Sequence, residues 1–156
     1  MKRFLLLLTS HVLVLGLGFS LGIYALPILV APAAPTEEEA ALAAHPAVFQ
    51  GQFRRDLKDS DWLHWGVGKV AVGPERIVLQ GRLAPGPDYK LYLSPEFVET
   101  EADFLRLKPR MQRVGDVRTF ENFVVPVPET VDVRQYQAVI VWCETFSQFI
   151  TAARYQ

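Results

Sequence analysis

Cys143 and His64 are the two residues of this 156-residue chain whose side chains point to redox or metal-ligand chemistry. Cys143 is the only cysteine and follows the apolar run 138–142, whereas His64 lies in a short segment that also holds Trp62 and Trp65. A lone cysteine has no partner for a disulfide within the chain. It is therefore a buried thiol, half of an intermolecular disulfide, a reactive thiol or a ligand.

The run that ends at Cys143 predicts a central strand. Strand alternation places Val139, Val141 and Cys143 on one face, and the other face is apolar as well. Cys143 is thus predicted to be buried, and packing alone would explain its presence. A nucleophilic thiolate is disfavoured because the neighbouring Glu144 opposes ionisation.

Ligation is chemically easier than nucleophilic catalysis, because a bond to a soft metal or to haem iron deprotonates the thiol. His64 is the candidate second ligand. A blue-copper site would need two histidines, but His11 lies in an apolar N-terminal segment and His45 in a proline-rich one. The sequence has no C-x-x-C-H for covalent haem attachment, and the identity of any metal stays open.

Several other functions are excluded. The chain has no P-loop, no dinucleotide-binding glycine motif, no zinc-protease motif and no nucleophile elbow. Two of the 16 basic residues, Lys2 and Arg3, precede the apolar segment, which leaves 14 against 17 acidic residues. A domain with a net negative charge repels phosphate backbones, so nucleic acid is not a predicted partner.

Residues 4–30 contain no charged side chain and predict a transmembrane helix. As a helix they reach about 40 Å, more than the roughly 30 Å hydrocarbon core of a bilayer. Lys2 and Arg3 place the N-terminus in the cytoplasm, so the rest of the chain is expected in the periplasm or outside the cell. A cleaved signal ending at residues 31–33 is the alternative, but its apolar region would be much shorter.

Three parts are therefore predicted: a signal anchor at residues 1–30, a Pro/Ala/Glu linker at 31–46 and a β domain at 47–156. The linker is expected to act as a spacer, with a short solvated helix over residues 40–44. Asp59 and Asp61 are expected in a turn rather than in a calcium loop. Residues 95–108 predict a short helix or an ordered excursion that covers the sheet.

The β domain is predicted from short apolar runs separated by Gly, Pro and Asp. We expect one small antiparallel sandwich or barrel. Its predicted strands are 48–54, 66–72, 76–83, 89–93, 120–127, 136–144 and a last short one near 149–153.

Three segments in order, Trp62–Gly68, Asp88–Leu93 and Val139–Phe146, resemble the DM-thirteen domain family. The resemblance covers about residues 47–156. It implies a β-rich extracytoplasmic electron-transfer domain in which the cysteine acts as a redox thiol or holds a prosthetic group such as haem. On this basis Cys143 is the candidate catalytic residue, and Cys143 with His64 would bind the cofactor.

The expected function is thus a redox or prosthetic-group role centred on Cys143. Its electron partners would be redox proteins of the membrane or the periplasm. The alternative is a binding or adaptor domain without enzymatic activity, in which Cys143 belongs to the core and Trp62, Trp65 and Trp142 line an apolar pocket.

Overall fold

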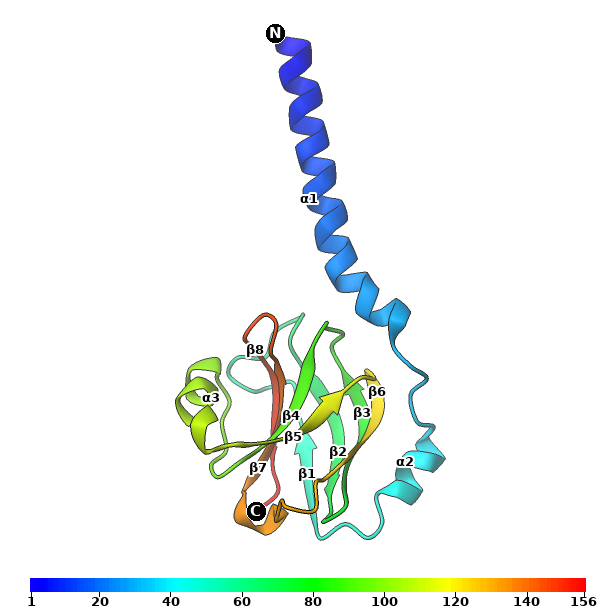
Figure 1. Ribbon diagram of the computed structural model, residues 1–156, viewed down its shortest axis with the longest axis vertical. Helices are drawn as coiled ribbons and strands as arrows, with labels where there is room; N and C mark the ends of the chain where they lie inside the picture. Colours follow the sequence, from blue (N-terminus) through cyan, green and yellow to red (C-terminus); the bar gives the residue numbers. More distant parts are fainter.

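The computed structural model describes residues 1–156 and consists of a long N-terminal helix followed by a β-sandwich (Figure 1). Helix α1 (Lys2–Val30) extends away from the sandwich and buries none of its residues. It is the one helix of the chain that is long and apolar enough to cross a membrane, by length and composition.

The sandwich has two antiparallel sheets of four strands each, which confirms the predicted all-β class. The first sheet has the order β1 (Phe49–Phe53), β2 (Gly66–Val72), β3 (Arg76–Leu83), β6 (Glu121–Pro126). The second has the order β5 (Gln112–Val117), β4 (Tyr89–Ser94), β7 (Ala138–Cys143), β8 (Gln148–Arg154). Strand β1 lies beside β8, and β5 lies beside β6, so the sheets also approach each other along both edges.

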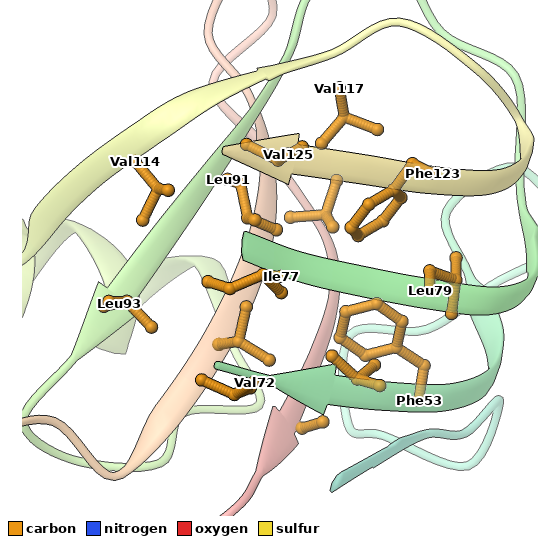
Figure 2. Packing of buried hydrophobic residues seen from close by; sticks show 14 of the residues in the cluster. Phe53, Val72, Ile77, Leu79, Leu91, Leu93, Val114, Val117, Phe123 and Val125 are labelled. Carbon is orange, nitrogen blue, oxygen red and sulfur yellow. The ribbon is translucent and has the colours of Figure 1, made fainter. Parts of the chain in front are cut away.

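The main core fills the space between the sheets (Figure 2). Every second residue of a strand points inward, so β7 contributes Val139, Val141 and Cys143 to this core. All six residues of β7 are buried, as predicted for a central strand. The facing sheet supplies large apolar side chains that include Phe53, Val72, Ile77, Leu79, Phe123 and Val125.

A second core covers the outer face of the sheet that contains β7. Helix α3 (Glu101–Leu107) begins at Thr100, whose side chain accepts a hydrogen bond from the Asp103 N–H. The helix lays Phe104 flat on Trp142, with ring centroids 3.9 Å apart and planes 11° from parallel. The excursion predicted at residues 95–108 is therefore a helical lid over the sheet, followed by the short 3₁₀-helix η1 (Lys108–Arg110).

The segment predicted as a solvated spacer is instead packed on the first sheet. Helix α2 (Glu37–Ala43) begins with a capping box in which Thr36 and Glu39 bind each other's backbone N–H groups. Ala40 on this helix is fully buried, and α2 lies against β3 and β6. Asn122 fixes the start of the segment by donating a hydrogen bond from Nδ2 to the Pro35 carbonyl, at 3.0 Å.

The Asn122 side chain also replaces a backbone hydrogen-bond partner where the pairing of β3 and β6 is irregular. Their register shifts between Leu79 and Arg82, and the Gly81 N–H donates to Asn122 Oδ1 at 2.9 Å. Across the sheet Gly81 pairs with Gly68, whose φ of +131° favours glycine. A Cβ on Gly81 would lie 2.0 Å from the Val67 carbonyl oxygen, so this approach requires glycine.

All seven predicted strands are present, with ends that differ from the prediction by at most two residues. Strand β5 was missed. Only Val114 and Val117 of this strand are buried, and its register with β4 shifts between Leu91 and Tyr92. The shift interrupts the period of two that makes a strand visible in a sequence.

Residues 133–135 form a second 3₁₀-helix, η2 (Val133–Gln135).

Replacing Phe104 with alanine should destabilise the domain by about 3–5 kcal/mol, because it removes a stacked, fully buried ring and leaves a cavity beside Trp142. Denaturant unfolding of the full chain in detergent micelles measures this loss. Leu105→Ala is the matched control, since Leu105 is exposed on the same helix, and it should cost less than about 0.5 kcal/mol. Equal losses of stability in the two variants would contradict the packing of α3 on the sheet through Phe104.

Candidate functional site

An apolar cavity of about 820 Å³ lies between α1 and the end of the sandwich nearest to it. Its walls come from the β1–β2, β3–β4 and β7–β8 connections and from one side of α1. This volume lies in the range of sites for small molecules and cofactors. The lining residues that carry chemistry or large apolar surface are Tyr24, Trp62, His64, Tyr89, Cys143 and Phe146.

Cys143 is the last residue of β7 and lies where the main core meets this cavity. It is 2% exposed, which confirms its predicted burial, and it belongs both to the core and to the cavity lining. Its cross-strand partner is Tyr89, the first residue of β4. The Tyr89 ring packs so closely over Gly86 that a Cβ there would lie 2.4 Å from the phenol oxygen.

Burial raises the pKa of the Cys143 thiol, and backbone hydrogen bonds from Phe146 and Asp88 only partly offset this effect. Burial also raises the pKa of Tyr89, and the adjacent Cys143 adds to that shift. Both groups are therefore protonated at neutral pH. A thiolate at this position requires a bond to a cation or metal to stabilise it.

His64 is held by a turn that Asp61 organises. One carboxylate oxygen of Asp61 accepts hydrogen bonds from the backbone N–H groups of Leu63 and His64, both at 2.7 Å. The other oxygen pairs with His64 Nδ1 at 2.9 Å. Burial acts to raise the pKa of Asp61, but these hydrogen bonds outweigh it and the pKa is lowered. An ionised Asp61 favours the tautomer with the proton on Nδ1. The lone pair of Nε2 is then free to bind a metal ion or to accept a hydrogen bond.

The turn that carries His64 is also fixed to its neighbours. Asp59 accepts a hydrogen bond from the Glu101 N–H at 2.6 Å, which joins the loop to the start of α3. The guanidinium of Arg55 lies 3.6 Å from the centre of the Trp65 ring. Asp59 and Asp61 are turn residues, as predicted, and the His64 side chain is positioned by a loop with several fixed points.

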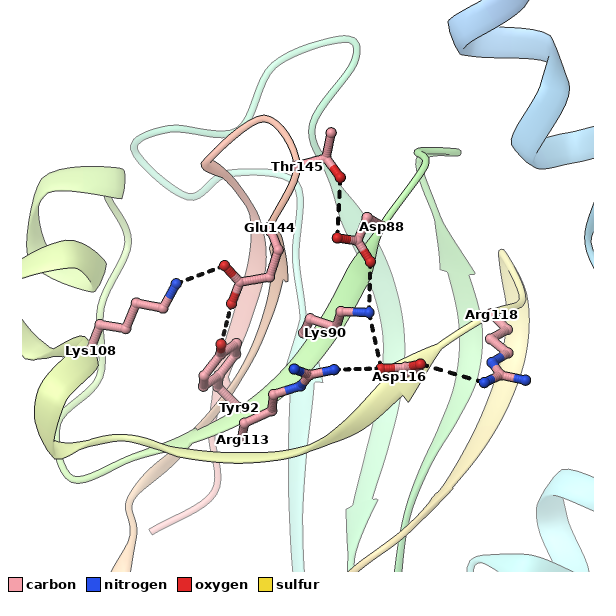
Figure 3. A network of polar contacts seen from close by, with 9 residues as sticks. All are labelled: Asp88, Lys90, Tyr92, Lys108, Arg113, Asp116, Arg118, Glu144 and Thr145. Carbon is pink, nitrogen blue, oxygen red and sulfur yellow. Dashed lines mark hydrogen bonds and ion pairs between the residues drawn. The ribbon is translucent and has the colours of Figure 1, made fainter.

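Asp88 holds together two of the connections that form the cavity rim (Figure 3). Its Oδ2 accepts a hydrogen bond from Thr145 Oγ1 at 3.1 Å, and its backbone carbonyl accepts one from the Glu144 N–H at 3.0 Å. Its other carboxylate oxygen pairs with Lys90 Nζ at 2.6 Å. The β3–β4 connection is thereby fastened to the β7–β8 turn directly beside Cys143.

Lys90 extends this network to Asp116 on β5, 3.0 Å away. Hydrogen bonds from Lys90 and then Arg113 lower the pKa of Asp116 to about 2. On the same outer face of the sheet, Glu144 accepts hydrogen bonds from Lys108, at 2.7 Å, and from the Tyr92 hydroxyl. The charged groups of these contacts are thus paired with one another (Figure 3).

The donor set of the site is small. No group of three or more His, Cys, Asp or Glu side chains lies close enough together to hold a metal ion. Cys143 and His64 are the two lining residues with a sulfur or nitrogen donor atom for a soft metal or for haem iron. A porphyrin supplies four ligands of its own, so the residues present fit a haem-type group better than a bare metal ion.

Comparison with known protein families finds one match that covers most of the β domain. Residues 56–155 match the family model described as "Electron transfer DM13". The chain belongs to this electron-transfer DM13 family. The match includes the Asp61 turn, His64 and Cys143, whereas α2 and β1 precede it. No curated protein and no solved structure matched the chain.

The structure brings both predicted ligands of this DM13 domain to one cavity, although they are 79 positions apart in the sequence. Their roles as ligands stay predictions. The expectation that three tryptophans line a common pocket is wrong. Trp62 lines the cavity, but Trp142 is fully buried in the core beneath α3 and Trp65 is covered by Arg55.

Tyr89, Phe146 and Asp88 are site residues that were not predicted from the sequence. Each follows a turn or lies within one, and nothing in its local sequence indicates that the three turns meet. The signal available was indirect, because Asp88 occurs in the same family-like segment as Tyr89, and Phe146 in the same one as Cys143. Only the strand pairing between β4 and β7 places them around the thiol.

The Cys143 thiol of the folded DM13 domain should react with an alkylating reagent at pH 7.5 on the order of 100-fold more slowly than in denaturant. Burial and a raised pKa both oppose its reaction, and exposure requires opening of a core strand. Mass spectrometry of the full chain over time measures the modification. Equal rates in the folded and denatured states would contradict the buried position.

Asp116→Asn should lower stability by about 1 kcal/mol at neutral pH, a value reduced for solvent screening because the side chain is 35% exposed. The folded pKa is depressed, so the stabilisation is complete above the unfolded value near 3.9 and is lost as the pH falls towards 2. Unfolding curves between pH 7 and pH 2 should therefore converge at the acidic end. Exposed Glu129→Gln is the control, and a difference as large at pH 2 as at pH 7 would contradict the assignment.

Proposed function

We propose that this DM13 protein is a membrane-anchored electron-transfer module whose redox centre occupies the cavity lined by Cys143 and His64. The observation that carries the proposal is that a buried cysteine and a carboxylate-oriented histidine line the same apolar space. This pairing supports a bound prosthetic group, with haem as the group that best matches two protein ligands.

The chemistry of the thiol favours a ligand over a free redox thiol. The raised pKa of Cys143 keeps sulfur protonated and a poor nucleophile. The chain also has no second cysteine with which to form an intramolecular disulfide during a redox cycle. Coordination would remove both difficulties, because a bond to haem iron would stabilise the thiolate, and Cys143 would hold the redox group without being oxidised itself.

In this proposal each element of the site has a separate task. When bound, haem supplies one-electron redox chemistry. Cys143 and His64 hold it, and Asp61 fixes the tautomer and orientation of His64. The apolar walls exclude water, and the Asp88 contacts keep the rim of the cavity in place. Burial and outer hydrogen bonds of this kind tune the reduction potential of a cofactor.

The anchor sets where this chemistry takes place. Helix α1 supports a single membrane crossing, with Lys2 and Arg3 on the cytoplasmic side. The β domain then lies on the periplasmic or outer face, joined to a retained signal anchor. Electron donors and acceptors are accordingly redox proteins in that membrane or in the periplasm.

A second candidate function is a binding module without redox activity. It is favoured by the position of Cys143 in the main core, where 2% exposure matches an ordinary packing residue. In that case the cavity holds an apolar ligand, and Trp62 and Phe146 provide contact surface. Cys143→Ser then changes stability but leaves ligand binding intact.

Absorption spectroscopy of the full chain in detergent, titrated with haem, tests the primary proposal. We expect a haem absorption band in the wild type and its loss in Cys143→Ser and His64→Ala. Asp61→Asn should weaken binding by roughly 10–100-fold, because it releases the histidine without removing it. His45→Ala is the control, since His45 does not line the cavity.

A chain that stays colourless and free of metal after the titration would overturn the haem proposal. Equal spectra for the wild type and the two ligand variants would do so as well. The unfolding midpoint of each variant shows whether a lost spectrum results from a lost ligand or from a misfolded domain.

A further inference from the structure

Two exposed aromatic side chains lie together at the end of the sandwich that carries the cavity. Trp62 in the β1–β2 connection is 82% exposed, and Phe146 in the β7–β8 turn is 47% exposed. They are the only aromatic residues of 31–156 that are exposed, and both line the cavity. Exposed aromatics confined to one end of a domain indicate an interaction surface.

The tether to α1 brings this same end close to the membrane proposed above. Helix α1 ends at Val30, and the chain is fixed to the sandwich again at Pro35 through the hydrogen bond from Asn122. Only residues 31–34 lie between these points, so Val30 and Pro35 are separated by at most about 18 Å of fully extended chain. Figure 1 shows the end of α1 beside the loops that carry the cavity.

The residues of α1 that line the cavity indicate the depth in the membrane at which the cavity opens. About 20 helical residues cross the hydrocarbon core, so a span that starts at Phe4 ends near Ile23. The cavity wall contributed by α1 consists of Leu17, Ser20, Leu21, Ile23 and Tyr24, which form the outer part of this span and its end. Ile23 and Tyr24 lie at the boundary between the hydrocarbon core and the outer headgroups, where Trp and Tyr side chains concentrate in membrane proteins.

We propose that the end of the sandwich bearing Trp62 and Phe146 lies in the outer headgroup layer of the membrane that holds α1. The inference rests on the anchor in the proposed function but is independent of haem and of Cys143. Two aromatic side chains at one end, a tether of four residues and a cavity wall from the membrane helix all place lipid at this surface. The cavity consequently opens towards the bilayer rather than towards free solvent.

Quenching of tryptophan fluorescence by brominated lipids tests this placement. The full chain is reconstituted into phosphatidylcholine vesicles in which bromine lies either near the headgroup or near the end of the acyl chains. We expect stronger quenching by the shallow bromines. This quenchable component should be lost in Trp62→Phe, which keeps an aromatic ring but removes the fluorophore.

Trp65→Phe is the matched control, because Trp65 lies in the same loop but packs under Arg55. It should retain the shallow quenching. Alkaline carbonate extraction of the same vesicles reports on the anchor separately. Retention of the chain together with quenching that depends on Trp62 supports the placement.

Retention without any quenching that depends on Trp62 overturns the placement and leaves the anchor standing. Release of the chain by carbonate overturns the anchor and this placement with it, while the haem titration in detergent still tests the redox proposal. Stronger quenching by the deep bromines than by the shallow ones also overturns a location in the headgroup layer.

Discussion

Strand β7 is buried on both faces, and this constraint organises the rest of the domain. One face supplies Val139, Val141 and Cys143 to the core between the sheets, and the other supplies Trp142 to the core beneath α3. Its pairing with β4 then places Tyr89 opposite Cys143. A single strand therefore joins the two cores and carries the candidate redox residue to the edge of one of them.

The position of Cys143 involves opposing effects. Burial stabilises the fold through apolar contact, but it keeps the thiol protonated and weakens it as a nucleophile. The same burial is useful to a ligand site, because a dry, apolar surrounding strengthens the bond to a charged centre and excludes competing water. The paired charges of Asp88, Lys90 and Asp116 hold the rim without adding an unpaired charge next to the thiol.

The short connection between α1 and the sandwich has a comparable role in placing the domain. Asn122 uses one side-chain amide to satisfy the irregular pairing at Gly81 and to fix Pro35. The buried Ala40 of α2 adds a second attachment on the same sheet. The attachment of α1, the geometry of the first sheet and the orientation of the cavity are thus coupled through one polar residue and a packed helix.

The apolar segment, the seven strands with alternating or continuous apolar runs, and the burial of Cys143 could all be predicted from the sequence. Each depends on local periodicity or composition, which a linear pattern records directly. Strand β5 could not, because its register shift removes the period of two. The packing of α2 on the first sheet was not predicted either. The alanine-rich run at residues 40–44 has no large apolar side chain pattern that indicates a buried face, and the burial of Ala40 arises only from its contact with the sheet.

The candidate site divides in the same way. The residue types of the site follow from the sequence alone, namely one cysteine without a partner and one histidine beside acidic turn residues. Their meeting at one cavity follows only from the three-dimensional fold. The same holds for the absence of Trp142 and Trp65 from the lining and for the positions of Tyr89, Asp88 and Phe146 around the thiol. Those relations arise from strand pairing and from the meeting of distant loops, and such long-range contacts leave no periodic signal in the sequence around each residue.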